Sequence, residues 1–323
     1  MQPVKLVRRA PLAMLLTLLL AFSACQGEAP TPQVADLPVP AIDSERAWNL
    51  LLKQVALGPR PSGSEANRKT RDLLVSELTS YGLKPVREAF QASTPIGVLA
   101  MENIFADLEG PLSASGEPAP MIVLGSHFDT KLLPFEFVGA NDGASSTGLL
   151  LELARVLANG PQPPLTYRFV FFDGEEATRT DWIDPDNRYG SKHHVKQIDK
   201  RKGALKRVKA MINLDLVGDK DLHLEYDSSS TRRLVELFRK TSIAIGDPDL
   251  FSRTPYPVED DHEMFIQLGI PSIDLIDLHF GPRDNEYWHQ AEDVVANCSK
   301  QSLERVGKLV LAALPEVIDT FAK

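Results

Sequence analysis

The chain has 323 residues, of which 43% are hydrophobic and 24% are charged, and its formal net charge is -9 at pH 7. These values are ordinary for a soluble globular protein, and they exclude wholesale disorder, a fibrous repeat and a polytopic membrane protein. The acidic balance argues against a surface that binds nucleic acid. Only two cysteines are present, so a disulfide framework is excluded as well.

The N-terminus has the pattern of an export signal. Basic residues up to Arg9 precede an uncharged, leucine-rich run at 10–24, which is too short to span a membrane comfortably. Small residues directly before Cys25 resemble a bacterial lipobox. We therefore expect residues 1–24 to be a signal peptide and Cys25 to be lipidated. The protein would then lie in a bacterial cell envelope, in the periplasm or on the outer membrane, held to the membrane by its lipid alone; ordinary secretion is the alternative.

Residues 25–42 are rich in proline and alanine and lack helical periodicity, which predicts an extended tether. The remaining residues, 43–323, are enough to build one large core without a second domain. We therefore expect a single catalytic domain after the tether.

Apolar periodicity predicts alternating helices and strands within this domain. In chain order these are helices at 44–55 and 73–81, strands at 84–91, 100–108 and 121–125, a helix at 147–158, strands at 167–172 and 210–216, a helix at 261–268, a strand at 270–276 and a C-terminal helix through 303–317. Such alternation is typical of an α/β fold. We expect a three-layer α/β/α sandwich with a central mixed, mostly parallel sheet.

Acids and histidines follow the predicted strands, at the point where each strand ends, or precede a helix. They are His127, Asp129, Asp142, Asp173, Glu175, Glu176, Asp215 and His289. In open α/β sheets, ligands bind beyond the carboxyl ends of the strands. We therefore expect these side chains to converge on one site, although each of them alone also has a structural explanation, such as helix capping by Asp142.

The residue types at these positions favour a metal site. Imidazole and carboxylate groups are ligands of Zn²⁺, and clustered carboxylates repel one another without a cation. Glu175 and Glu176 point to opposite sides of an extended segment, so one can bind metal while the other acts as a general base. The sequence contains no H-E-x-x-H, G-x-S-x-G, P-loop or G-x-G-x-x-G motif. Four further histidines, His193, His194, His223 and His279, are expected to be surface or packing residues.

A family resemblance rests on six segments in fixed order. They are His127-Phe-Asp129, Phe137-Val-Gly-Ala-Asn-Asp142-Gly, Phe171-Phe-Asp-Gly-Glu175-Glu176-Ala, Tyr189-Gly-Ser-Lys, Leu214-Asp215-Leu-Val-Gly and Trp288-His289. This set resembles the zinc-dependent aminopeptidase family that includes the glutaminyl-peptide cyclotransferases. The resemblance covers nearly all of residues 44–320 and implies the zinc exopeptidase fold.

The resemblance implies two possible metal sets. Dizinc aminopeptidases of the family would hold one zinc through His127 and Asp215 and another through Glu176 and His289, with Asp142 as the bridge. Cyclotransferases keep these residue types but typically hold one zinc, through Asp142, Glu176 and His289. The ligands alone therefore leave both branches open.

Other residues favour the cyclotransferase branch, and within it a bacterial enzyme. Asp260 provides an acid directly before an Asp-His pair, and Trp182 and Trp288 match pocket tryptophans of the cyclases. The resemblance then implies that Glu175 is the catalytic base and that Asp260 and Asp215 hold it and the leaving amide in place. The substrate would be a peptide with N-terminal glutamine, converted to pyroglutamate with release of ammonia. The alternatives are a dizinc aminopeptidase and a non-catalytic, lipid-anchored peptide-binding protein.

The chain departs from the animal cyclases at three places. Ser126 and Thr147 stand where those enzymes have a cysteine pair beside the site. Asp274 stands where they have a histidine. The loop between Asp274 and His289 is longer. These departures fit a bacterial version of the enzyme with an altered pocket.

Overall fold

The computed structural model describes residues 41–200, 203–283 and 285–322. The predicted signal peptide at 1–24, Cys25 and nearly all of the tether lie outside these residues. No helix in the described ranges is long and apolar enough to cross a membrane.

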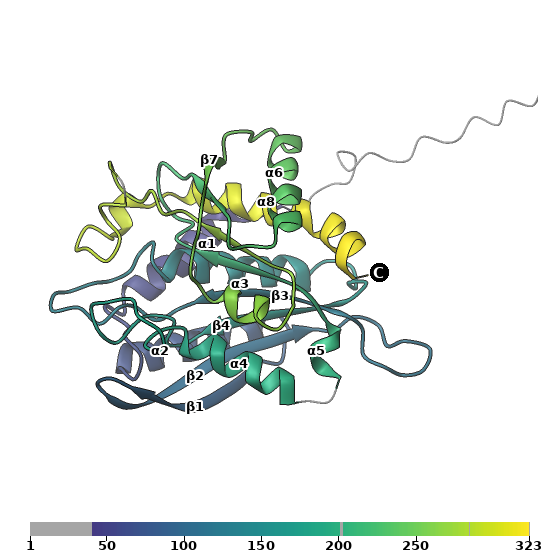
Figure 1. The fold of residues 1–323 in the computed structure, drawn as a ribbon, viewed down its shortest axis with the longest axis horizontal. Coiled ribbons are helices and arrows are strands. Elements are labelled where there is room, and N and C mark those ends of the chain that lie inside the picture. The colour runs from purple at the N-terminus through teal and green to yellow at the C-terminus, as the bar shows by residue number, and fades with distance from the viewer. Residues whose placement is uncertain (1–40, 201–202, 284, 323) are drawn as a thin grey trace, which may run out of the picture. The chain divides into compact units, whose positions relative to one another are not determined.

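A six-stranded mixed sheet forms the centre of the domain (Figure 1). In spatial order its strands are β1 (Val86–Thr94), β2 (Gly97–Leu108), β4 (Thr166–Phe172), β3 (Met121–His127), β5 (Val208–Asp215) and β8 (Ser272–Ile276). The strands from β4 to β8 run parallel, and the β1–β2 hairpin joins them antiparallel through β2. The expected mixed, mostly parallel sheet is confirmed.

Helices cover both faces of this sheet (Figure 1). One face carries α1 (Ser44–Val55), α2 (Glu65–Ser80), α3 (Ala144–Ala158), α6 (Arg232–Ala244) and α8 (Lys300–Phe321); the other carries α4 (Tyr189–Lys200), α5 (Ala204–Arg207) and α7 (His262–Ile266). Residues alternate between the faces, so that Ile122 and Leu124 of β3 join one apolar cluster and Val123 joins the other. The expected three layers are therefore present.

A second, two-stranded sheet stands beside β8. It pairs β6 (Leu224–Asp227) with β7 (Phe251–Tyr256) in parallel. The sequence did not predict these strands or the helices α4 and α6. The helix expected at 147–158 is right but begins three residues earlier, at Ala144, because the left-handed backbone of Gly143, with φ of 86°, ends the preceding turn there.

Candidate metal centre and active site

The carboxyl ends of the parallel strands bring the predicted site residues together. His127 is the last residue of β3, and Asp215 is the last residue of β5. Glu175 and Glu176 follow β4, and Asp142 lies in the turn before α3. This placement follows from the topology, since parallel strands present their carboxyl ends at one edge.

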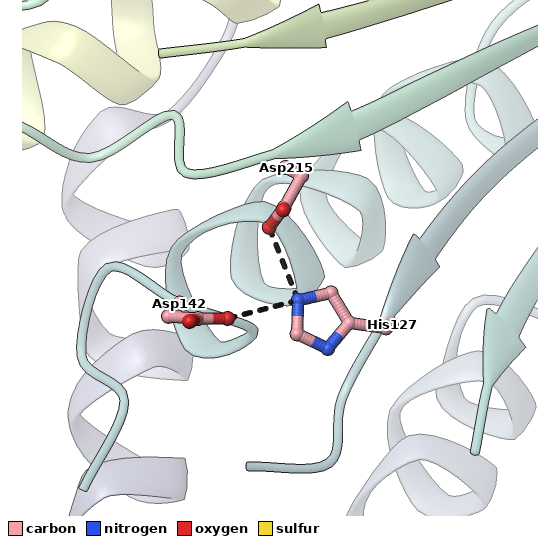
Figure 2. Close-up of side chains that lie close together, drawn as sticks. All are labelled: His127, Asp142 and Asp215. Atoms are coloured by element: carbon pink, nitrogen blue, oxygen red, sulfur yellow. Dashed lines mark hydrogen bonds and ion pairs between the residues drawn. The ribbon is translucent and has the colours of Figure 1, made fainter. Parts of the chain in front are cut away.

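Asp142 lies between two histidines and uses one oxygen for each. Its Oδ1 is 3.2 Å from His127 Nε2, and the same nitrogen is 3.1 Å from Asp215 Oδ1 (Figure 2). Its Oδ2 is 3.2 Å from His289 Nε2, which is 2.9 Å from Glu176 Oε1. Asp142 is thus shared by two candidate ligand groups, and within each group the ligand atoms lie no more than 4.8 Å apart.

These two groups fit a divalent metal such as zinc. Each combines imidazole nitrogen with carboxylate oxygens, the donor set of catalytic zinc sites. Asp142 Oδ2 is buried and accepts no hydrogen bond within the described residues, and it lies 3.2 Å from His289 Nε2, as two ligands of one ion would. The carboxylates outweigh the effect of burial and raise the pKa of His289 to about 9 and that of His127 well above its usual value. The cluster therefore attracts positive charge, as a metal site does.

Two buried acids hold the segments that carry the ligands. Asp293 accepts hydrogen bonds from the amides of Asn141 at 2.6 Å and Asp142 at 3.0 Å. Asp129 accepts hydrogen bonds from the amides of Glu175 at 3.2 Å and Glu176 at 3.4 Å. Both acids thereby fix the ligand-bearing backbone rather than reaching the metal position.

Backbone strain is concentrated at the same site. Leu216 and His289 have left-handed φ values of 49° and 55°, which are uncommon for residues other than glycine. The amide of Leu216 turns back and donates to Asp215 Oδ1 at 2.7 Å. Arg188, with φ of 49°, donates its amide to the carbonyl of Glu175 at 2.7 Å. Strained residues of this kind mark functional sites.

Glu175 is the candidate general base. It is 5% exposed, and its Oε2 is 4.0 Å from His127 Nδ1. Burial, reinforced by the carboxyls of Asp260 and Glu176, raises its pKa well above 4.5 against the opposing effect of His127. A carboxylate whose pKa is raised in this way takes up a proton more readily near neutral pH.

Asp260 belongs to a buried polar network that also contains Asn213 and Asp274. Asn213 donates through one amide nitrogen to Asp260 at 2.9 Å and to Asp274 at 3.2 Å. Burial and Asp260 together raise the pKa of Asp274 well above its usual value. His262 lies beyond, with Nδ1 3.8 Å from Asp274 Oδ2. The contacts of Asp260 thus connect it to Asn213 and Asp274, and the sequence had not identified Asn213.

An open cavity of about 900 Å³ faces the metal centre. Trp182 and Trp288 both line it, and Trp288 stacks on His289 with ring centroids 4.0 Å apart. Buried Lys131 lies 5.9 Å from the Trp182 ring centre and 3.5 Å from Glu176 Oε2. The tryptophans therefore lie where the sequence predicted, whereas nothing in the sequence indicated Lys131.

The four remaining histidines divide between packing and the cavity. His193 stacks on Phe90, and buried His194 contacts Glu88 at 2.8 Å, as expected of packing residues. His223 is exposed. His279 is also exposed, as expected of a surface residue, and it lines the cavity.

Ser126 and Thr147 meet beside the metal centre. Their hydroxyl oxygens are 3.3 Å apart, and each hydroxyl donates to the carbonyl of His127. Hydrogen bonds thus join the two positions at which the sequence resemblance implied a departure from a cysteine pair.

Known proteins that resemble this chain in sequence or fold include cyclotransferases and an aminopeptidase. The glutaminyl-peptide cyclotransferase-like protein of Bos taurus is 29% identical, over 89% of this chain and 81% of its own. The crystal structure of an Acidobacteriales bacterium glutaminyl cyclase superposes with a TM-score of 0.81 at 31% identity, over 90% of this chain and 98% of that one. A leucine aminopeptidase precursor from Bacteroides thetaiotaomicron gives a TM-score of 0.73 at 25% identity, over 85% and 97%. The model of peptidase family M28 matches residues 103–314, and the chain belongs to this family.

Proposed function

We propose that the protein is a zinc-dependent glutaminyl-peptide cyclotransferase, which converts the N-terminal glutamine of peptides to pyroglutamate and releases ammonia. The observation that carries this proposal is one cavity that joins Glu175, the Asp142–Glu176–His289 ligand group and the two tryptophans. The likeness to cyclotransferases and bacterial glutaminyl cyclases supports it.

The residues around the cavity divide the chemistry among them. A zinc ion bound by Asp142, Glu176 and His289 would supply Lewis-acid polarisation of the γ-carbonyl of the substrate. Glu175 takes the proton from the attacking α-amine and delivers it to the nitrogen of the leaving ammonia. Trp182 and Trp288 wall the pocket and keep the glutamine side chain folded toward its own amine. Because the attack is intramolecular, this positioning supplies a large part of the rate.

We expect one tightly bound zinc, at the Asp142–Glu176–His289 group. Glu176 Oε2 faces the ammonium group of Lys131. Glu176 Oε1 faces His289 Nε2, so Oε1 is the oxygen that would bind a metal together with His289. At the other group, Asp215 Oδ1 already accepts the amide hydrogen of Leu216 at 2.7 Å. This bond competes with a metal for the oxygen that faces His127, so a second zinc would bind more weakly.

An aminopeptidase is the second candidate function. It is favoured by the bridging position of Asp142 between two complete ligand groups and by the likeness to the leucine aminopeptidase precursor. In that reaction Glu175 would take a proton from water instead of from the substrate amine.

Mass spectrometry of peptides incubated with the pure protein separates the two functions. A peptide with N-terminal glutamine should lose only ammonia, and a peptide with N-terminal leucine should remain intact. Release of free leucine, together with two tightly bound zinc ions, would show that the protein is an aminopeptidase and not a cyclotransferase. No change in either peptide would favour the binding protein.

We also propose that the enzyme acts in the bacterial cell envelope. The support is the leader at 1–24 and the lipobox-like sequence before Cys25. A lipid on Cys25 and the proline-rich segment after it would hold the catalytic domain near the membrane.

A further inference from the structure

The cavity is larger than the proposed reaction at a single residue requires. Its volume of about 900 Å³ lies near the upper end for pockets that hold drug-sized ligands. One glutaminyl residue fills a small part of such a space. Part of the cavity is therefore available for the peptide residues that come after the glutamine.

The cavity has a second polar region that shares no residue with the ligand groups. Glu225 of β6, Ser252 of β7 and His279 after β8 all line it. An apolar cluster connects this region with the metal centre: it includes Leu216, which follows Asp215, and is packed by Leu278, which precedes His279. A peptide that starts at the metal centre can thus cross apolar surface to reach His279.

The second polar region is built to orient one imidazole. Glu225 is only 4% exposed, and its Oε1 lies 2.9 Å from His279 Nδ1 while its Oε2 accepts the Ser252 hydroxyl at 3.2 Å. The amide of His279 donates to buried Asp277 at 2.8 Å. Burying a carboxylate costs free energy unless the carboxylate has polar partners. The buried Glu225 carboxylate has such partners in Ser252 and His279, and it thereby holds the His279 ring, which is 51% exposed, in one orientation.

This orientation leaves Nε2 as the ring nitrogen available to a ligand. A carboxylate 2.9 Å from Nδ1 favours the neutral tautomer that carries its proton on Nδ1. Nε2 of that tautomer accepts a hydrogen bond, and Nε2 of a protonated ring donates one. A peptide main chain offers partners for both states, an N–H and a C=O. Main-chain groups are also common to all peptides, whatever their sequence.

We propose that His279, oriented by Glu225 and Ser252, is a subsite for the main chain of the residues that follow the N-terminal glutamine of the substrate. The inference rests on the proposed cyclotransferase function and adds that the enzyme favours peptides over free glutamine derivatives. His279 contributes to binding and not to the proton transfers.

The test compares a short and a long substrate. Initial rates of ammonia release are measured with glutamine amide and with the amide of Gln-Ala-Ala-Ala, and the ratio of kcat/KM for the long to the short substrate is formed. The His279→Ala variant should lower this ratio about fivefold, the effect of one lost hydrogen bond. Glu225→Gln should lower it as well, because it disturbs the orientation of the ring.

His223→Ala is the matched control, since His223 is an exposed histidine that does not line the cavity. It should leave the ratio unchanged. An unchanged ratio in His279→Ala, or an equal loss on both substrates, would overturn the subsite alone. Absence of ammonia release from both substrates in the unaltered enzyme would overturn the proposed function and the subsite with it.

Discussion

Replacing Ser126 and Thr147 together by cysteine should create a stabilising disulfide beside the metal centre. The two hydroxyl oxygens are 3.3 Å apart in a fully buried place, so the side chains are adjacent, as a disulfide requires. The bridge would close a loop of about 21 residues, which lowers the entropy of the unfolded chain by the equivalent of about 3 kcal/mol.

The double substitution also removes hydrogen bonds. The two hydroxyls donate to the carbonyl of His127 at 2.9 and 2.7 Å, and the Ser126 hydroxyl also lies 2.9 Å from that of Ser146. Because each hydroxyl has one proton to donate, the substitution removes about two donated bonds, each of which contributes about 1 kcal/mol. The oxidised variant should therefore gain only about 1 kcal/mol over the natural protein, and the reduced variant should lose about 2 kcal/mol. The free energy of unfolding therefore differs more between the oxidised and reduced forms of the variant than between either form and the natural protein.

Urea unfolding with and without reductant measures this difference at fixed zinc concentration. Ser126→Cys alone, which has no partner at position 147, is the control and should be slightly destabilised in both conditions. Neither hydroxyl lines the cavity, so ammonia release should persist in the oxidised variant. Equal stability of the two redox states, with the bridge shown to have formed, would refute the reasoning.

The remaining predictions concern the chemistry and the anchor. Glu175→Gln should keep its zinc but lose about 10²- to 10⁴-fold in kcat, whereas His289→Ala should lose most of its zinc; near-normal turnover of the first would rule out Glu175 as the base. Asp260→Ser should suppress cyclisation more strongly than it lowers zinc content, and parallel losses of both would instead make Asp260 part of the metal site. Cys25→Ser should move the protein from the membrane to the soluble fraction, and a variant that stays in the membrane would contradict lipidation.

The positions of the candidate metal ligands could be predicted from the sequence because the fold fixes them directly. His127 and Asp215 end parallel strands, and Glu176 follows another. A residue in such a place must lie at the carboxyl edge of the sheet once the strands are recognised. The layers were predictable for the same reason, since the nearly continuous apolar runs along β3 and β5 require cover on both faces.

Residues that act through the pairing of strands or the path of loops could not be predicted in this way. Asn213 contacts the acid network because it pairs with Asp274 in the register of β5 and β8, and the sequence alone does not give a register. Asp293, Lys131 and His279 lie in loops, where nothing in the local pattern indicates direction. The helix α4 is hard to recognise because lysines and histidines obscure its short apolar stripe, and α6 begins with two arginines and carries further basic and polar residues in its second half.

The sharing of Asp142 between two ligand groups has a consequence for metal counting. One of its oxygens faces His127 and the other faces His289. An ion bound to one oxygen of Asp142 would withdraw negative charge from the other oxygen. A second cation bound there would also be repelled by the first across a short distance. Zinc uptake should therefore be anticooperative, with an apparent stoichiometry that rises from one toward two as free zinc increases. Small changes in the acids near the weaker end would then be enough to convert a one-metal enzyme into a two-metal enzyme on an unchanged fold.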